Sequence, residues 1–210
     1  MDFDDFVNLV TTRKVTMAQQ RRLRALWEIS GSSIGCQVHE AARWEAQTLV
    51  RRYKAILTDV KGTEKRMAAI AGKFQEYECL LSIPGFGPIV SAMVLAAIGD
   101  PSRFTHRKQL LRLAGLDLSA SRSGQTSDTA KPVISKQGKA ALRYALVQAA
   151  MIASAKSSSI RGYFAKLIKG RELECGIMLK MKVKLAAKLL VVAWTLMKTK
   201  ENFKASYFME

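Results

Sequence analysis

Cysteine, proline and long hydrophobic runs are all scarce in this sequence. Its 210 residues include three cysteines, at positions 36, 79 and 175, and no Cys-x-x-Cys pair. An odd number of widely spaced cysteines argues against a disulfide framework or a zinc site and is typical of a reducing compartment. The chain has only four Pro and 13 Gly, a composition that favours a helical protein over a disordered or collagen-like one.

No stretch of the sequence has the pattern of a membrane-spanning or secretory segment. The most apolar one, residues 185–197, is too short to span a bilayer and contains Lys188. Met1 is followed closely by Asp2, Asp4 and Asp5, which is not the pattern of a secretory signal. We therefore expect a cytoplasmic protein with no membrane partner.

Acidic residues are also scarce relative to basic ones. The chain has 17 Asp and Glu against 34 Lys and Arg, a formal net charge of +17. Residues 131–200 alone carry 15 Lys and Arg against two Glu, a net charge of +13. Self-repulsion on this scale destabilises a compact state unless a polyanion offsets it. The charge therefore indicates a nucleic-acid partner in preference to an anionic membrane surface.

Residues 50–74 form the longest periodic segment. Apolar or small residues recur there at alternating spacings of three and four, as at the a and d positions of more than three heptads. Glu64 and the nearby Gly62 weaken this seam. Two interpretations stay open: a core helix packed against its own chain, or a coiled coil that pairs two protomers into a homo-oligomer. The seam consists of Val50, Tyr53, Leu57, Val60, Glu64, Met67, Ala71 and Phe74.

Apolar periodicity predicts helices in most of the remaining chain. One or two short helices are expected over residues 3–31, with Thr16 as the N-cap before Met17. From residue 115 to 135 the helical period disappears, and a loop of that length is usually functional or disordered. The other helices are expected over residues 90–98, 104–113, 138–153 and 178–197.

A turn rich in glycine and proline separates two of these helices. Its glycines, Gly85 and Gly87, permit tight or positive-φ backbone conformations. The helix that follows begins with free N–H groups, which together with the helix dipole form a site for a DNA phosphate. Such contacts position a duplex without reading its sequence. The segment Ile83-Pro84-Gly85-Phe86-Gly87-Pro88 thus indicates a helix-hairpin-helix turn, although Pro-Gly also marks ordinary turns.

Serine and basic residues dominate the segment that leads into the helix at residue 138. A serine hydroxyl there could attack phosphorus and divide strand exchange into two easier steps. Nearby cations could hold the scissile phosphate and stabilise its developing charge. From composition alone, a solvated loop is the more common interpretation. The basic candidates are Arg122, Lys136, Lys139 and Arg143.

Two longer segments carry a family resemblance. They read LLSIPGFGPIVSAMVLAAIGDPSRF and AGLDLSASRSGQTSDTAKPVISKQGKAALRYALVQAA. Both closely resemble the C-terminal domain of the DEDD-type insertion-sequence transposases, the Transposase-20 domain. The resemblance is strong over about residues 80–155, where Ile-Ser-Lys-Gln-Gly followed by Leu-Arg is specific, and weaker over residues 182–197.

The resemblance implies chemistry and partners that the residues alone do not. In that family an N-terminal RuvC-like nuclease domain supplies four acidic metal ligands, and a serine of the C-terminal domain becomes covalently joined to DNA. A structured guide RNA bridges donor and target, and a coiled-coil region helps the protein to assemble. The family serine lies in a Ser-Gly or Ser-x-Gly step shortly before Ile-Ser-Lys. Ser123, before Gly124, is the best match, and Ser121 is the runner-up.

The nuclease domain of that family is not recognisable in this sequence. Asp2, Asp4 and Asp5 precede no apolar strand of the expected kind. Four other acidic residues are expected on helices or loops without a shared strand framework, namely Asp59, Glu64, Asp100 and Asp128. We therefore expect no metal site and no cofactor in this chain. Mg²⁺ is expected only together with the nuclease domain, and the chain alone should lack recombinase activity. The competing interpretation is a non-catalytic helix-hairpin-helix module that binds DNA without a reacting serine.

These patterns together predict an all-α fold in three parts. Residues 1–78 form a helical region with a long coiled-coil-like helix. Residues 79–200 form a helix-hairpin-helix core with a serine-rich catalytic loop against a basic helix. Residues 201–210 form a tail that is expected to be frayed.

Overall fold

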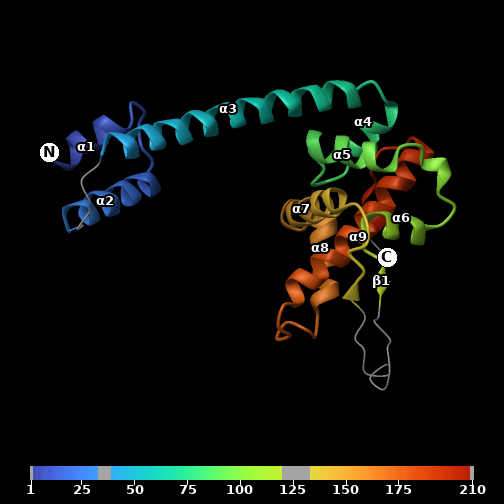
Figure 1. The fold of residues 1–210 in the computed structure, drawn as a ribbon. Helices are drawn as coiled ribbons and strands as arrows, with labels where there is room; N and C mark the ends of the chain where they lie inside the picture. The colour runs from blue at the N-terminus through green and yellow to red at the C-terminus, as the bar shows by residue number, and fades with distance from the viewer. Residues whose placement is uncertain (1, 33–38, 120–132, 209–210) are drawn as a thin grey trace, which may run out of the picture. The chain divides into compact units, whose positions relative to one another are not determined.

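The computed structural model describes residues 2–32, 39–119 and 133–208 (Figure 1). By its internal contacts the chain divides into two units, Met1–Ile56 and Leu57–Glu210. The described residues are mostly helical, and they contain one short two-stranded sheet. The all-α fold class is therefore confirmed. No helix in these residues is long and apolar enough to cross a membrane.

The first unit contains two short helices and the beginning of a long one. Helices α1 (Phe3–Val10) and α2 (Met17–Ser32) contact each other, and the rings of Phe3 and Trp27 meet edge to face with centroids 6.0 Å apart. The Thr16 hydroxyl accepts a hydrogen bond from the Gln19 nitrogen at 3.4 Å. This bond confirms Thr16 as the predicted N-cap of α2.

Helix α3 (Glu40–Ala71) runs without interruption through Gly62. Leu57 and Val60 of the heptad seam are 41% and 46% exposed, and Val50 and Tyr53 are more exposed still. The seam from Val50 to Val60 is therefore not buried in the core of either unit, whereas Ala71 at its C-terminal end is buried beside Tyr77 and Ala92. Phe74, the last seam position, lies beyond the helix end, because the chain turns after Ala71.

The second unit is built around helix α9 (Ile177–Thr199), which packs most extensively against α7 (Ala140–Lys156). Along α9, Leu185, Leu189 and Leu196 recur at helical spacing and are fully buried. The facing residues of α7 include several buried alanines, whose small side chains allow other segments to approach its backbone closely. Helix α9 also contacts α4 (Gln75–Leu81), α6 (Arg107–Ala114) and α8 (Ser158–Ile168).

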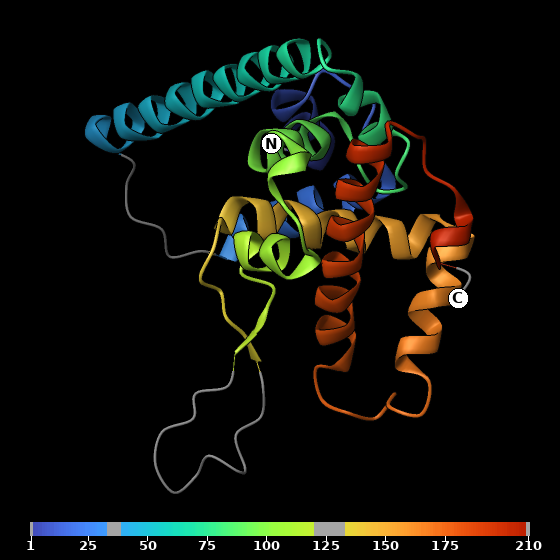
Figure 2. The same ribbon diagram turned by 90° about the vertical axis from the view of Figure 1, so that its right-hand side faces the viewer.

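Several details of the second unit differ from the expectations. Helix α8 was not expected, and Figure 2 shows it beside α9. Helix α6 begins at Arg107 and not at residue 104, because Asp100 instead caps a 3-10 turn, η1 (Pro101–Arg103). The residues after 115 are not wholly irregular: β1 (Leu118–Ser119) pairs antiparallel with β2 (Val133–Ile134).

The expectation of a frayed tail is wrong as far as residue 208. A 3-10 turn, η3 (Ala205–Phe208), packs against α8, and Phe208 is only 2% exposed. The Phe208 and Tyr163 rings meet with centroids 5.3 Å apart. The Phe203 nitrogen donates to the Ser82 hydroxyl at 2.8 Å. Apolar burial and this hydrogen bond together fix the tail to the second unit.

Candidate nucleic-acid-binding and catalytic site

The turn between α4 and α5 (Pro88–Ile98) holds two glycines with different surroundings. Gly85 has a φ of +90° and lies against α7, where an added Cβ would be 2.4 Å from the Ala149 carbonyl oxygen. Ile83 and Phe86, on either side of it, are buried. Gly85 is therefore needed for the turn conformation and for close packing. It is itself partly exposed, and its binding of a phosphate stays a prediction.

Gly87 occupies the open side of the same turn. Its φ is −85°, it is the N-cap of α5, and an added Cβ would meet nothing within 4 Å. Pro88, at the first helical position, has no N–H and starts the helix with a favourable φ. The first turn of α5 is thus arranged as expected for a phosphate site at Gly87, and phosphate binding there stays a prediction.

Residues 135–139, which follow Ile134 and include the rest of the Ile-Ser-Lys-Gln-Gly phrase, are hydrogen-bonded to the C-terminal end of α6. The Lys136 nitrogen donates to the Gly115 carbonyl at 3.1 Å, and the Lys139 nitrogen donates to the Leu113 carbonyl at 2.7 Å. A Cβ at Gly138 would lie 2.4 Å from the Gly115 nitrogen. Only glycine fits this position without displacing backbone. We name residues 135–139 and the end of α6 the clamp.

Two of the predicted basic residues donate hydrogen bonds within this region. The Arg143 guanidinium donates to the Ala114 carbonyl at 2.9 Å and to the Lys136 carbonyl at 3.3 Å. The Lys139 ammonium donates to the Ala97 carbonyl at 3.1 Å, near the end of α5. Both cations thus stabilise unpaired carbonyls at helix C-termini. Their role in holding a phosphate stays a prediction.

Lys136 differs from these two residues. It has a φ of +56°, a conformation that side chains other than glycine seldom adopt. Its own backbone N–H and carbonyl are both bonded, to Gly115 and Arg143 respectively. Its side chain is exposed. Among the described residues that were predicted to hold a phosphate, Lys136 has the side-chain cation most available to a ligand.

Next to the clamp, the β1–β2 pair holds the two ends of the serine-rich segment together. Leu118 lies opposite Ile134 and Ser119 opposite Val133 in the β1–β2 pair. The Ser135 hydroxyl donates to the Asp117 carboxylate, and the Ser135 nitrogen donates to the Asp117 carbonyl at 2.8 Å. The candidate nucleophiles Ser123 and Ser121, and Arg122 with them, lie outside the described residues.

The glycine turn and the clamp lie at opposite ends of α5. Gly87 precedes its first residue, whereas Lys139 of the clamp bonds to Ala97 near its last. Ten residues of α-helix separate these points by about 15 Å at 1.5 Å per residue. The predicted phosphate-binding residues therefore form two groups. A nucleic acid that contacted both would have to run along α5.

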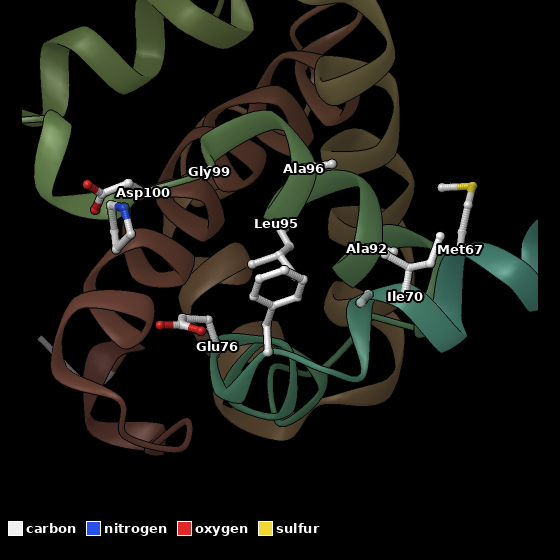
Figure 3. Close-up of a pocket in the computed structure, with 11 residues that line it drawn as sticks. Met67, Ile70, Glu76, Ala92, Leu95, Ala96, Gly99 and Asp100 are labelled. Atoms are coloured by element: carbon white, nitrogen blue, oxygen red, sulfur yellow. The ribbon is translucent and has the colours of Figure 1, made fainter.

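Two of the hollows among the described residues of the second unit have opposite character. One is a groove of about 580 Å³ between the end of α3, α4 and α5, lined mainly by apolar side chains such as Ile70, Phe74 and Leu95 (Figure 3). Its polar lining includes two carboxylates, those of Glu76 and Asp100. Carboxylates repel phosphate, so this groove is unsuited to nucleic acid.

The other hollow is a basic cleft of about 680 Å³ between α6, α8, α9 and the tail. Arg107, Lys184 and Lys188 line it, together with Tyr163 and Tyr207. Sequence reasoning did not find this cleft, because its residues come from four separate segments. The only signal was the excess of lysine in residues 131–200.

Residues 77–165 match the model of a family described as Transposase IS116/IS110/IS902 family. The matched range includes the glycine turn, the clamp and all of α7, and it ends within α8. The match supports an insertion-sequence transposase domain in this part of the chain, and with it a role in transposition and an interaction with DNA. None of the curated proteins matches the chain.

The described residues contain no cluster of metal-ligating side chains. No three His, Cys, Asp or Glu side chains gather in them in a way that could hold an ion. Mg²⁺ sites in proteins use carboxylates together with water or phosphate oxygens. No step of the chemistry proposed below is therefore assigned to a metal held by these residues.

Proposed function

We propose that this chain is the C-terminal, DNA- and RNA-engaging portion of an insertion-sequence transposase and that Ser123 is its nucleophile. The observation that best supports this proposal is the family match over residues 77–165, which includes the serine-rich segment. The β1–β2 pair beside the clamp adds a physical reason, since it joins the two ends of that segment. A guide RNA and a homo-oligomer belong to the same proposal.

The proposed chemical step is a transesterification. The Ser123 oxygen forms a bond to the scissile phosphorus, the bond from phosphorus to one strand end breaks, and that strand end leaves as a hydroxyl that takes up a proton. A covalent phosphoserine holds the other strand end until a second hydroxyl attacks. Arg122 and Lys136 would orient the phosphate and stabilise its charge. A serine hydroxyl is a weak nucleophile that needs an activating group, and we expect the nuclease domain to supply that group.

The second candidate is a DNA-binding module in which no serine reacts. The observation that favours it is the open first turn of α5 at Gly87 and Pro88, in a chain of net charge +17. A covalent protein–DNA adduct in the complete recombinase distinguishes the two candidates. Both of them share the next prediction.

Duplex DNA is expected to bind this chain without sequence preference and with a steep dependence on salt. Each phosphate contact contributes a slope of about −0.9 to log K against log salt. With four or more contacts, affinity should fall at least about a hundredfold between 50 and 200 mM salt. Fluorescence anisotropy with two duplexes of unrelated sequence measures both properties. An affinity that hardly changes with salt would rule out the electrostatic basis of the proposal.

The exposed seam of α3 is expected to pair two copies of the chain. Replacing Leu57 and Val60, at a and d positions, with lysine would place like charges in the seam and should convert dimer to monomer. Light scattering over a concentration series measures the change. The matched control carries two lysines at f positions of the same helix, in place of Ala55 and Gly62, and should stay dimeric. A wild-type monomer at high concentration would contradict pairing.

A further inference from the structure

The basic cleft of the second unit has an unusual balance of charge. Its lining contains the cations Arg107 from α6 and Lys184 and Lys188 from α9, and it contains no carboxylate. The ion pairs within the described residues engage other cations, namely Arg171, Lys200 and Lys204. Three like charges thus line one hollow, and no carboxylate of the described residues forms an ion pair with any of them. An anion in the cleft would offset their repulsion.

The floor of the cleft is held in place by aromatic contacts. The Lys188 ammonium lies 4.5 Å from the centroid of the Tyr163 ring and 5.1 Å from that of the buried Phe208 ring. Cation–π contacts of this kind fix a lysine head without neutralising its charge. Burial also raises the pKa of the Tyr163 phenol. Tyr163 therefore stays a neutral hydroxyl, which can donate to an anion.

The outer wall of the cleft belongs to the tail, which supplies Ser206 and Tyr207. The Tyr207 ring stacks on Phe203 with centroids 6.2 Å apart, and the Phe203 nitrogen is bonded to Ser82 at the start of the glycine turn. The tail is thus attached at both ends, to the turn by Phe203 and to α8 by Phe208. These contacts hold the tail in place, and the tail brings the Tyr207 ring into the same cleft as Lys184 and Lys188.

We propose that this cleft binds one unpaired nucleotide of a nucleic-acid strand, with its base against Tyr207 and its phosphate among Arg107, Lys184 and Lys188. That the ligand is a nucleic acid rests on the proposed function. The site itself is new, since it lies outside the glycine turn and the clamp. Aromatic rings that stack bases beside a basic groove are the usual means of holding single strands. The volume, about 680 Å³, is in the range of pockets for small ligands.

The combination of ring and cations favours a single strand over a duplex. In a duplex the bases are paired and stacked inside, so a base and its own phosphate cannot enter one cleft together. An unstacked nucleotide of a loop, bulge or strand end presents both. RNA and DNA share this chemistry, and the test compares them directly.

The test measures the affinity of the full chain for three probes of equal length by fluorescence anisotropy. These are a single-stranded RNA, the single-stranded DNA of the same sequence, and the corresponding duplex DNA. Lys184→Glu should weaken binding of at least one single strand tenfold or more and binding of the duplex less than threefold. Lys73→Glu is the charge-matched control, since Lys73 is exposed and does not line the cleft. It should affect all three probes alike.

A second pair of variants tests stacking apart from charge. Tyr207→Ala should weaken single-strand binding about tenfold, the loss of one stacked base, and Tyr207→Phe should restore it to within about twofold. Thermal unfolding of each variant shows that the fold is kept. Weaker binding of the RNA probe alone assigns the cleft to RNA. Weaker binding of both single-stranded probes means that the cleft accepts a nucleotide of RNA or of DNA. If Lys184→Glu and Lys73→Glu had equal effects on all probes, the proposed nucleotide site in the cleft would be overturned and the proposed function would stand. A wild-type chain that binds none of the probes would overturn both.

Discussion

Replacing Ser123 with alanine is expected to abolish the covalent protein–DNA adduct and strand exchange in the complete recombinase, which means this chain together with a nuclease domain, guide RNA and DNA. The hydroxyl oxygen of the nucleophile becomes part of the phosphoserine bond, so no other group of that side chain can substitute for it. Denaturing electrophoresis of labelled DNA detects the adduct. The chain alone should bind DNA and form no adduct, even with Mg²⁺ added.

The neighbouring serines are the matched controls for this experiment. Ser121→Ala and Ser119→Ala remove the same atom and should keep the adduct. An adduct that survives Ser123→Ala and is lost with Ser121→Ala would move the nucleophile by two residues. Full strand exchange by all three variants would remove the nucleophile from this segment. The DNA-binding module would then be the better description of the chain.

The helices of the second unit could be predicted because their signals are local. Helix α9 repeats Leu185, Leu189 and Leu196 on one face, and α5 lies between a Gly-Pro step and Gly99. Periodicity and end signals of this kind depend only on neighbours in sequence. The all-α class and most helix positions followed from them. Helix α8 was missed, because it begins directly after α7 without Gly or Pro, and Ser157 alone separates the two.

The candidate site was less predictable because its geometry depends on contacts distant in sequence. Gly138 was part of a recognisable phrase, but its role comes from contact with Gly115, 23 residues earlier. The buried position of Phe208 depends on Tyr163 of α8. No pattern within the last ten residues of the chain indicates that contact. The basic cleft depends on both the tail and α8, so its residues could not be grouped from the sequence.

The glycine turn places its two glycines in different surroundings. Both Gly85 and Gly87 were predicted to serve DNA binding. In the structure Gly85 is packed on α7 with a φ of +90°, and only Gly87 lies on the open side. The same short segment thus fixes the turn against the core with one glycine and opens the N-terminus of α5 with the other. Stability measurements separate these two roles.

Replacing Gly85 with alanine is expected to destabilise the second unit by at least about 3 kcal/mol, the combined cost of a strained positive φ and of overpacking. The new Cβ would lie 2.4 Å from the Ala149 carbonyl oxygen and 3.0 Å from the Ala153 nitrogen. Both atoms are backbone, so α7 itself would have to move. For a unit of this size the loss corresponds to a fall in Tm of about 6–12 °C.

Gly87→Ala is the matched control, two residues away in the same turn. Its φ of −85° suits alanine and its Cβ would meet nothing within 4 Å, so its free energy of unfolding should change by less than about 1 kcal/mol, the scale of an N-cap substitution. Thermal or urea unfolding followed by circular dichroism measures both variants. If Gly85→Ala were as stable as Gly87→Ala, the close contact between the turn and α7 would be disproved.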